Sequence, residues 1–486
     1  MWLFLYGINN YYMVFLFLRK NKKELLQNSE YLEKFWSTHG QDSLPKVTTQ
    51  LPIYNERNVI ERLIHAVVNI DYPQVLHEVQ ILDDSQDETK TIVDSLVNTY
   101  KSKGFNIKCI RRNDRSGFKA GALNSGLEVA EGEFLAIFDA DFIPGKDFFY
   151  KMIPFFYEKE KVALIQARWG HVNGDYSLLS KAQSIGIDGH FVIEQGARTW
   201  NGLYMNFNGT AGMWRKEAIF DAGGWHADTL TEDLDLSYRA QLKGWKTKYL
   251  INVVAPSELP VDINAYKSQQ HRWAKGSIQT AIKILPRLFN THDTLIKKIE
   301  ATMHLTQYMV HPMMCILAVL SLPLILLLKS VTIPTSVPMM VFFFLMFLGV
   351  LAPSFLYIIS QKIAYKDWWK RCLFIPVLMF LGCGIAINNT KAVIEALLRI
   401  KSDFLRTPKY GVVKQGRNKM AKDYTLPLKS TFVVEILLSV YCCVGFMQYT
   451  SDKRFIFGPF LLIYAIGFFY VGMLSFLQAF RKYIKC

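Results

Sequence analysis

The hydrophobic positions of residues 45–265 form short apolar runs that are separated by amphipathic stretches. The runs have the length and composition of buried strands, and the stretches between them have helical spacing of apolar residues. The predicted strands are 47–53, 78–82, 107–110 and 134–138, and the predicted helices are 56–69, 87–103 and 118–130. This alternation predicts an α/β domain of parallel strands and crossover helices. Ligands of such sheets bind beyond the carboxyl ends of the strands.

A second pattern begins after residue 300, where the apolar runs become long enough to cross a bilayer. A helical span needs about 20 mostly apolar residues. Runs of this kind occupy 308–328, 338–360, 431–450 and 455–478. The shorter run 2–18 is followed by basic residues and by no small-residue cleavage site, so we expect residues 1–23 to be an uncleaved membrane anchor.

Basic residues predict the orientation of these spans, because short loops rich in Lys and Arg face the cytosol. The basic cluster after the first span places the α/β domain on the cytosolic side. Residues 391–429, with ten basic and three acidic residues, are expected on the same side. The apolar segment 372–390 is therefore expected to enter and return, or to lie along the interface, bent by Pro376, Gly382 and Gly384. This gives five spans and one irregular segment, with six simple spans as the alternative.

Composition agrees with a membrane protein and excludes other classes. Hydrophobic residues make up 51% of the chain, and much of the net charge of +15 lies beside apolar runs, which favours a membrane over other anionic partners. No zinc finger or RNA-binding signature accompanies the charge, so we expect no nucleic-acid partner. The seven cysteines contain no Cys-X-X-Cys pair, so neither a zinc site nor a disulfide framework is predicted.

Two carboxylates directly follow the predicted strand 134–138. Asp139 and Asp141 alternate with Ala140, so both side chains can turn towards one point. Oxygen ligands of this kind suit Mg²⁺ or Mn²⁺, which neutralises a diphosphate. A solvated turn is the structural alternative, but the position at a strand end favours a metal site.

Further polar residues lie at the same predicted edge of the sheet. Asp83 and Asp84 end a strand, as Glu56 does, and such carboxylates accept hydrogen bonds from a base or a ribose. Capping of the next helix by Ser85 is compatible with that role. Lys119 opens a helix of small residues, where a cation and close backbone approach suit a phosphate.

An acidic motif precedes the amphipathic run 234–242. Glu232 and Asp233 follow Thr231, and either of two interpretations applies to them. Acids in a first helical turn are favoured by the helix dipole. A carboxylate can also act as the general base for an attacking hydroxyl group.

Two motifs lie closer to the membrane. The first motif is residues 269–273, in which Trp273 offers a flat face for a sugar ring and Arg272 offers paired N–H donors for a phosphate. An interfacial amphipathic helix with aromatic anchors is the structural alternative for these residues. Residues 404–409 lie in the basic stretch and predict no more than a loop beside the membrane.

Taken in order, these motifs resemble those of the processive, membrane-bound glycosyltransferases of family 2. The last motif differs, because Arg406 stands where that family often has Val. Residues 207–212 and 223–225 are most similar to the plant cellulose synthase-like A and C subfamilies and their bacterial relatives. We accordingly expect no cyclic-di-GMP-binding domain of the kind that bacterial cellulose synthase has. The resembling motifs are Asp83-Asp84, Asp139-Ala140-Asp141, Thr231-Glu232-Asp233, Gln269 to Trp273 and Phe404 to Lys409.

The resemblance implies a GT-A (nucleotide-diphospho-sugar transferase) domain over 45–265, interfacial helices over 266–300 and a transmembrane region over 301–486. It also implies a role for each motif. Asp233 is the base, with Glu232 nearby, and Asp139 and Asp141 hold the metal ion. The nucleotide sugar contacts Glu56, Asp83, Asp84, Lys119, Asp139 and Arg272, the acceptor contacts Gln269 and Trp273, and Phe404, Thr407 and Lys409 form a gating loop.

We therefore expect an inverting hexosyltransferase that extends a β-glycan from UDP-glucose or GDP-mannose and exports it. A transferase that adds one sugar to a lipid is the alternative. A non-catalytic scaffold or transporter is disfavoured, because Glu435 is the one charged residue within the predicted spans. The expected location is a bacterial inner membrane, or a Golgi or plasma membrane in a eukaryote.

Overall fold

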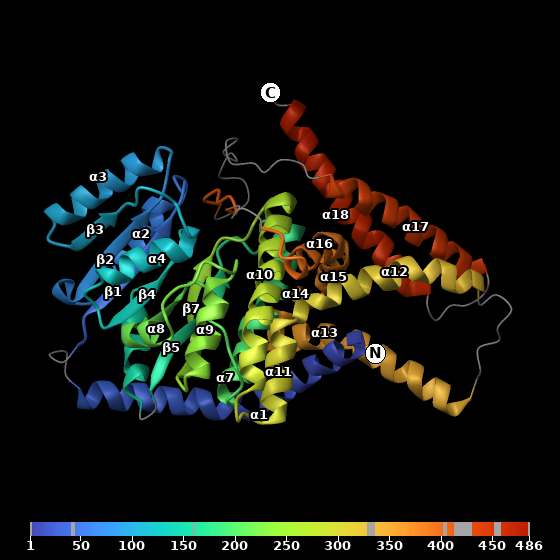
Figure 1. Ribbon diagram of the computed structural model, residues 1–486, viewed down its shortest axis with the longest axis horizontal. Helices are drawn as coiled ribbons and strands as arrows, with labels where there is room; N and C mark the ends of the chain where they lie inside the picture. The colour runs from blue at the N-terminus through green and yellow to red at the C-terminus, as the bar shows by residue number, and fades with distance from the viewer. Residues whose placement is uncertain are drawn as a thin grey trace.

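The computed structural model describes residues 2–39, 44–158, 161–327, 336–401, 406–412, 430–451 and 458–484. A seven-stranded sheet with its covering helices lies on one side of the molecule, and a group of long helices lies on the other (Figure 1). The helices α10 (Ile263–Phe289) and α11 (Leu295–Leu305) stand between these two parts.

The strands follow the order β3-β2-β1-β4-β6-β5-β7. β6 runs antiparallel to β4 and β5, whereas the other neighbouring pairs are parallel. The register sets Ile53 beside Asp83 and Gln50 beside Ile137, so β1, β2 and β4 end at the same edge. The bounds are β1 (Val47–Ile53), β2 (His77–Asp83), β3 (Asn106–Ile110), β4 (Phe134–Ile137), β5 (Val162–His171), β6 (Gly212–Arg215) and β7 (Lys246–Ser257).

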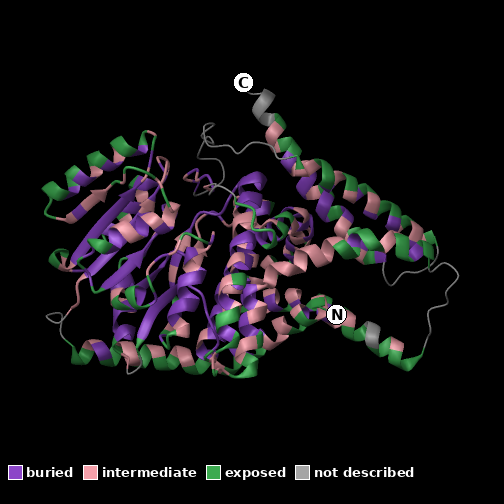
Figure 2. Ribbon diagram, in the orientation of Figure 1, coloured by how far each residue is buried: buried purple, intermediate pink, exposed green. Residues whose placement is uncertain are grey.

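The four predicted strands agree with β1 to β4 to within one residue at each end. The predicted crossover helices are also present, as α2 (Ile60–Val68), α3 (Thr89–Ser102) and α4 (Phe118–Glu128). One apolar core lies between the sheet and α2 with α3, and a second core lies between the sheet and α4, α8 (Lys216–Asp221) and α9 (Glu232–Leu242). Figure 2 shows the strands as the most buried part of the protein.

A continuous helical segment after β5 connects the sheet domain to the long helices. It consists of α6 (Leu178–Asp188), the π-helix η4 (Gly189–Glu194) and α7 (Gln195–Trp200). Phe191 of η4 packs in one buried cluster with Phe17 of α1 (Trp2–Thr38) and Leu356 of α13 (Val337–Ala364). The short elements η2 (Gln74–Leu76), α5 (Phe148–Met152), η3 (Ile153–Tyr157) and η5 (Gln307–Met309) complete this part.

Four helices in the described part of the chain are long and apolar enough to span a membrane, which confirms the predicted runs. They cover Gln307–Leu327, Val337–Ala364, Thr431–Ser451 and Gly458–Phe480, and contain α12 (Val310–Leu327), α13, α17 (Thr431–Ser451) and most of α18 (Gly458–Ile484). The predicted anchor 1–23 lies in α1. This helix packs along α13, and the two backbones come close where Gly7 contacts Gly349. Its hydropathy is too low for α1 to be counted among the four candidate spans. The anchor therefore stays a prediction.

The segment 372–390 is broken, as the sequence predicts. α14 (Trp368–Cys372) and α15 (Ile375–Gly384) are followed by α16 (Ala386–Leu397), and the axis bends by 44° at the break. Gly384 allows the break to pack tightly, because a Cβ atom there would lie 2.3 Å from the carbonyl oxygen of Gly467. A bent pair of this kind is either one broken span or a re-entrant loop.

The charge of Glu435, which is isolated in the sequence, has a partner in the structure. Nζ of Lys267, in the second turn of α10, lies 2.6 Å from Oε1 of Glu435 and 3.2 Å from Oγ1 of Thr431. Both members of the ion pair are completely buried. The Ile263 amide also donates to Oε1 of Gln478 at 2.8 Å. These contacts attach α10 to α17 and α18.

We expect Lys267→Met to lower the free energy of unfolding by about 3–5 kcal/mol, because it leaves a buried carboxylate without its cation. Thermal unfolding in detergent measures this. Lys151→Met, which removes an exposed ion pair with Asp147, is the matched control and should change stability little. A double variant of Lys267→Met and Glu435→Gln should regain part of the lost unfolding free energy. If the double variant instead lost as much unfolding free energy as the two single variants together, this role for the pair would be contradicted.

Candidate active site

A cavity opens at the carboxyl edge of the sheet, between the ends of β1 and β4 and the helices α9 and α10. Twelve of the predicted site residues line it. They come from segments that are far apart in the sequence: Glu56, Asp84, Lys119, Asp139, Asp141, Glu232, Asp233, Gln269, Arg272, Trp273, Thr407 and Lys409. Phe404, the remaining residue of the predicted gating loop, lies outside the described residues.

Asp83 is placed differently from Asp84. Consecutive residues at the end of a strand face opposite sides of the sheet. Asp84 lines the cavity and accepts from Nε of Arg112 at 3.0 Å, whereas the fully buried Asp83 accepts from Nε of Arg111 at 2.9 Å and lies outside the cavity lining. Asp83 therefore holds Arg111 and the turn after β2, and Asp84 is the one of the two that lines the cavity, while nucleotide binding by either residue stays a prediction.

The two carboxylates after β4 both face the cavity. The amide of Asp139 donates to Oγ1 of Thr210 at 2.8 Å, which fixes the start of the turn. Lys119 lies 2.6 Å from Oδ1 of Asp139, and Lys409 forms an ion pair with Asp141. Although burial lowers the pKa of Lys119, the neighbouring carboxylates outweigh this and raise it, so Lys119 stays charged.

The donor set of this turn fits a divalent cation. Asp139 and Asp141 offer carboxylate oxygens that line the cavity, and a different ammonium group contacts each of them, Lys119 at Asp139 and Lys409 at Asp141. Carboxylate oxygens are the ligands that Mg²⁺ and Mn²⁺ prefer, so the two side chains could hold either ion.

Asp233 is held at the start of α9 with its carboxylate in the cavity. Its Oδ1 accepts from the amide of Leu234 at 2.8 Å. Gly209 lies close to this carboxylate on the other side and has a φ of +78°. A Cβ atom at this position would lie only 2.9 Å from Oδ2 of Asp233. A glycine is required here both for the left-handed backbone and for the close approach.

Burial and charge make Asp233 more basic than an ordinary carboxylate. Burial, and to a smaller extent the neighbouring Glu232, raise the pKa of Asp233 to about 7 against the opposing effect of Lys119. Burial also raises the pKa of Glu232. A carboxylate with a pKa near neutrality is well matched to accept a proton from a sugar hydroxyl group.

The pKa of Asp233 predicts a pH dependence. A base is active when deprotonated, so transfer should increase about tenfold between pH 6 and pH 8 and decline as the pH falls through about 7. The measurement is kcat against pH at saturating donor. Glu232→Gln, which removes a neighbouring negative charge, should shift the profile to lower pH. A profile that is flat over this range would exclude a titrating base with this pKa.

The motif from Gln269 to Trp273, predicted to bind the acceptor, lies on α10, whose N-terminus is capped by Asp262 through the amides of Asn264 and Ala265. Gln269, Arg272 and Trp273 all line the cavity. His271 instead faces α16, where its Nε2 lies 3.2 Å from Oε2 of Glu395. Three residues of the motif therefore face the cavity, whereas His271 contacts α16.

Segment 406–412 lies against the part of the cavity that Glu56 lines. Arg406 forms an ion pair with Glu56 at 2.5 Å, and the Tyr410 amide donates to Oε1 of Glu258 at 2.9 Å. Burial raises the pKa of Glu56 to about 7, against the opposing effect of Arg406 and Lys409. Asn58 donates to the carbonyl of Lys409 at 3.0 Å.

Several residues that line this cavity were not predicted as site residues, among them Arg406, Tyr54 and Arg115. Arg406 was noted as a departure from the family motif and not as a site residue, although it contacts Glu56 directly. Tyr54 and Arg115 also line the cavity, with the guanidinium carbon 3.3 Å from the ring centroid. Tyr54 could have been predicted, because it directly follows β1 at the carboxyl edge of the sheet. The loop that carries Arg115 shows no sequence pattern that indicates a site residue.

Comparison with known proteins extends these observations. Residues 45–276 match the family described as glycosyltransferase like family 2, and residues 214–455 match the cellulose synthase family. Glucomannan 4-beta-mannosyltransferase 9 of Arabidopsis thaliana is 39% identical over 303 residues, 61% of this chain and 57% of the relative. Glucomannan 4-beta-mannosyltransferase 1 of Oryza sativa subsp. japonica is 42% identical over 266 residues, 54% of this chain and 51% of the relative.

The chain spans about half the length of the curated relatives that it matches. Among solved structures, mannosyltransferase PcManGT from Pyrobaculum calidifontis, in complex with GDP-Man and Mn²⁺, aligns with a TM-score of 0.49 and 19% identity over 82% of this chain and 100% of that chain. The mixed seven-stranded sheet is the GT-A fold that the sequence motifs implied. The two family matches together cover the sheet domain, α10 and the apolar helices up to residue 455, and the chain belongs to the cellulose synthase-like glycosyltransferases of family 2.

Proposed function

We propose that the protein is an inverting hexosyltransferase that extends a β-glycan, with GDP-mannose as its donor. The observation that carries this proposal is the convergence of Asp233, the pair Asp139 and Asp141, and Trp273 on one cavity. The donor sugar is inferred from relatives named glucomannan 4-beta-mannosyltransferases, which are 39% and 42% identical to this chain. UDP-glucose is the second donor to test.

The proposed reaction follows from the placement of the groups. Asp233 accepts the proton of the acceptor hydroxyl group, whose oxygen attacks the anomeric carbon on the face opposite to the nucleotide. The bond to the nucleoside diphosphate breaks, so an α-linked donor gives a β-linked product. Asp139 and Asp141 would hold the divalent cation, which neutralises charge on the diphosphate. Arg272 and Lys119 supply further positive charge at the same cavity.

The acceptor and the membrane helices are connected in this proposal. The flat indole of Trp273 supports the terminal sugar of the acceptor, and Gln269 lies one turn earlier on α10. The same helix is attached to α17 and α18 through Lys267. A growing chain that leaves Trp273 thus starts beside the apolar helices, and we propose that it is exported there, with the sheet domain in the cytosol.

A panel of labelled nucleotide sugars tests this proposal. Membranes that contain the protein are incubated with GDP-mannose, UDP-glucose and UDP-N-acetylglucosamine, and the insoluble and lipid-extractable products are counted separately. We expect label from GDP-mannose in a polymer that endo-β-mannanase digests. Label confined to a lipid fraction carrying one sugar would support the alternative acceptor, and no incorporation from any donor would contradict the proposal.

A further inference from the structure

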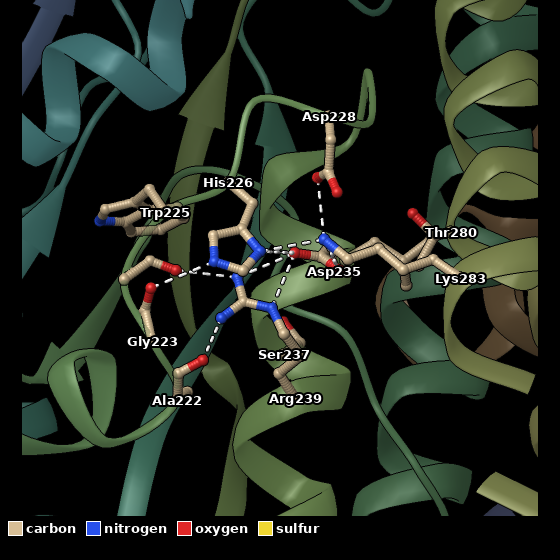
Figure 3. Close-up of polar contacts among 12 residues, drawn as sticks. Ala222, Gly223, Trp225, His226, Asp228, Asp235, Ser237, Arg239, Thr280 and Lys283 are labelled. Carbon is tan, nitrogen blue, oxygen red and sulfur yellow. Dashed lines mark hydrogen bonds and ion pairs between the residues drawn. The ribbon is translucent and has the colours of Figure 1, made fainter. Parts of the chain in front are cut away.

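A cluster of charged residues lies outside the cavity, between the start of α9 and one face of α10 (Figure 3). Nζ of Lys283 lies 2.8 Å from Oδ1 of Asp228, 2.9 Å from Oδ1 of Asp235 and 3.0 Å from Nδ1 of His226. Nε of Arg239 donates to Oδ2 of Asp235 at 2.8 Å. Asp235 is completely buried, so its charge depends on these two cations.

The cluster is an internal ion network and not a metal site. The ligand atoms of His226, Asp228 and Asp235 lie within 4.8 Å of one another, which alone would suit a metal ion. Lys283 already contacts all three, and the charges of two carboxylates and two cations cancel. Because a lysine ammonium only donates, Nδ1 of His226 accepts, and its Nε2 donates to the Gly223 carbonyl at 3.2 Å.

Lys283 belongs to a row of residues on α10 that all contact the segment leading to Asp233. Oε1 of Gln279 accepts from the amide of Leu230 at 3.0 Å. The hydroxyl oxygens of Thr280 and Thr231 lie 3.1 Å apart. Residues three and four apart share one face of a helix. We call this row the clamp face of α10, consisting of Gly276, Gln279, Thr280 and Lys283.

Gly276 shows how closely the clamp face approaches. A Cβ atom at this position would lie 2.5 Å from Cγ2 and 2.9 Å from the backbone nitrogen of Thr231. No larger side chain fits without moving Thr231 away from α10. The backbone two residues before Asp233 therefore lies directly on the helix.

The clamp face and the cavity share a helix. Arg272, which lines the cavity, lies one turn before Gly276 on α10. Asp233 lies between Thr231 and Asp235, and both of these neighbours are held by the clamp face. The distance between the carboxylate of Asp233 and Arg272 of α10 is thus set by contacts of the clamp face, whose own residues are not part of the cavity lining.

We propose that the clamp face of α10 positions the carboxylate of Asp233 for catalysis, and that Lys283 is its principal positioning residue. This inference rests on the proposed function, in which Asp233 is the base. A misplaced base slows proton transfer but leaves the donor site at Asp84 and Asp139 intact. The expected signature is a loss in kcat without a change in KM for the donor.

The test uses the purified full-length protein and four variants. Lys283→Met removes the ammonium group, Lys283→Arg keeps a cation, and Gly276→Ala displaces Thr231 without changing any charge. Lys243→Met is the matched control, because it removes an exposed ion pair with Asp221 at the other end of α9. Steady-state kinetics are combined with hydrogen exchange of the amides of residues 229–235.

We expect Lys283→Met and Gly276→Ala to lose about 10- to 100-fold in kcat at unchanged donor KM, since small displacements of reacting groups have effects of this size. Amides 229–235 should exchange faster in both variants. Lys283→Arg should restore most of the kcat, and Lys243→Met should resemble the wild type.

Wild-type kcat and exchange in Lys283→Met would overturn the inference. The inference would also be overturned if the activity of Lys283→Met fell only in proportion to the amount of folded protein, so that each folded molecule kept the wild-type kcat. A wild-type protein that transfers no sugar would instead contradict the proposed function, and the exchange experiment would still show whether Lys283 holds this segment.

Discussion

Asp233→Asn is expected to reduce sugar transfer by about 10² to 10⁴-fold while nucleotide binding persists, because an amide cannot accept the acceptor proton. The side chain lies in the cavity with a pKa of about 7, so the wild-type carboxylate is available as a base near neutral pH. The substitution keeps the size of the side chain beside Gly209. Transfer is measured with labelled donor, and nucleotide binding by titration calorimetry.

Asp221→Asn is the matched control for this substitution. Asp221 lies at the end of α8, where it forms an exposed ion pair with Lys243. The control should transfer sugar at the wild-type rate. Near-normal turnover of Asp233→Asn would remove Asp233 from the role of base, and loss of nucleotide binding in that variant would indicate a change in the donor site instead.

The second large effect is expected at the turn after β4. Asp139→Ala and Asp141→Ala should each lower nucleotide affinity and activity by about 10²-fold or more, because in the proposed reaction each would remove an oxygen ligand of the divalent cation that neutralises the diphosphate. Asp141→Ala also leaves Lys409 without its ion pair. Nucleotide affinity is measured with and without Mg²⁺ or Mn²⁺.

In the wild type, the cation should strengthen nucleotide binding and a chelator should abolish transfer, whereas the two variants should respond little to either. Asp147→Ala, at an exposed ion pair with Lys151, is the control and should behave as the wild type does. Full activity of the wild type in excess chelator would contradict the metal assignment.

Local sequence patterns were sufficient to predict the first half of the sheet. Each of the strands β1 to β4 is a short stretch with buried apolar residues that is followed by a polar turn, and amphipathic stretches with helical periodicity separate the strands in the sequence. β6 could not be predicted in this way. It contains four residues, Gly212–Arg215, and pairs with β4 and β5 through contacts with residues that are distant in sequence.

The candidate site was predicted to a similar degree and for similar reasons. Residues that end strands or begin helices were found, because the fold brings such ends to one edge. Asp83 and Asp84 could not be distinguished, since the direction of each side chain depends on where β2 ends. The contacts of Lys283 and Arg406 join segments that are 48 or more residues apart, and no local pattern reports them.

The linkage and length of the product test the central claim most directly. Purified protein is supplied with labelled GDP-mannose, Mg²⁺ or Mn²⁺ and a short β-linked oligosaccharide, and the products are separated by size and digested with linkage-specific hydrolases. We predict a ladder of products that extends by one hexose at each step, that endo-β-mannanase degrades, and that is absent with Asp233→Asn. An α-linked product, or one that forms equally well with Asp233→Asn, would contradict the account.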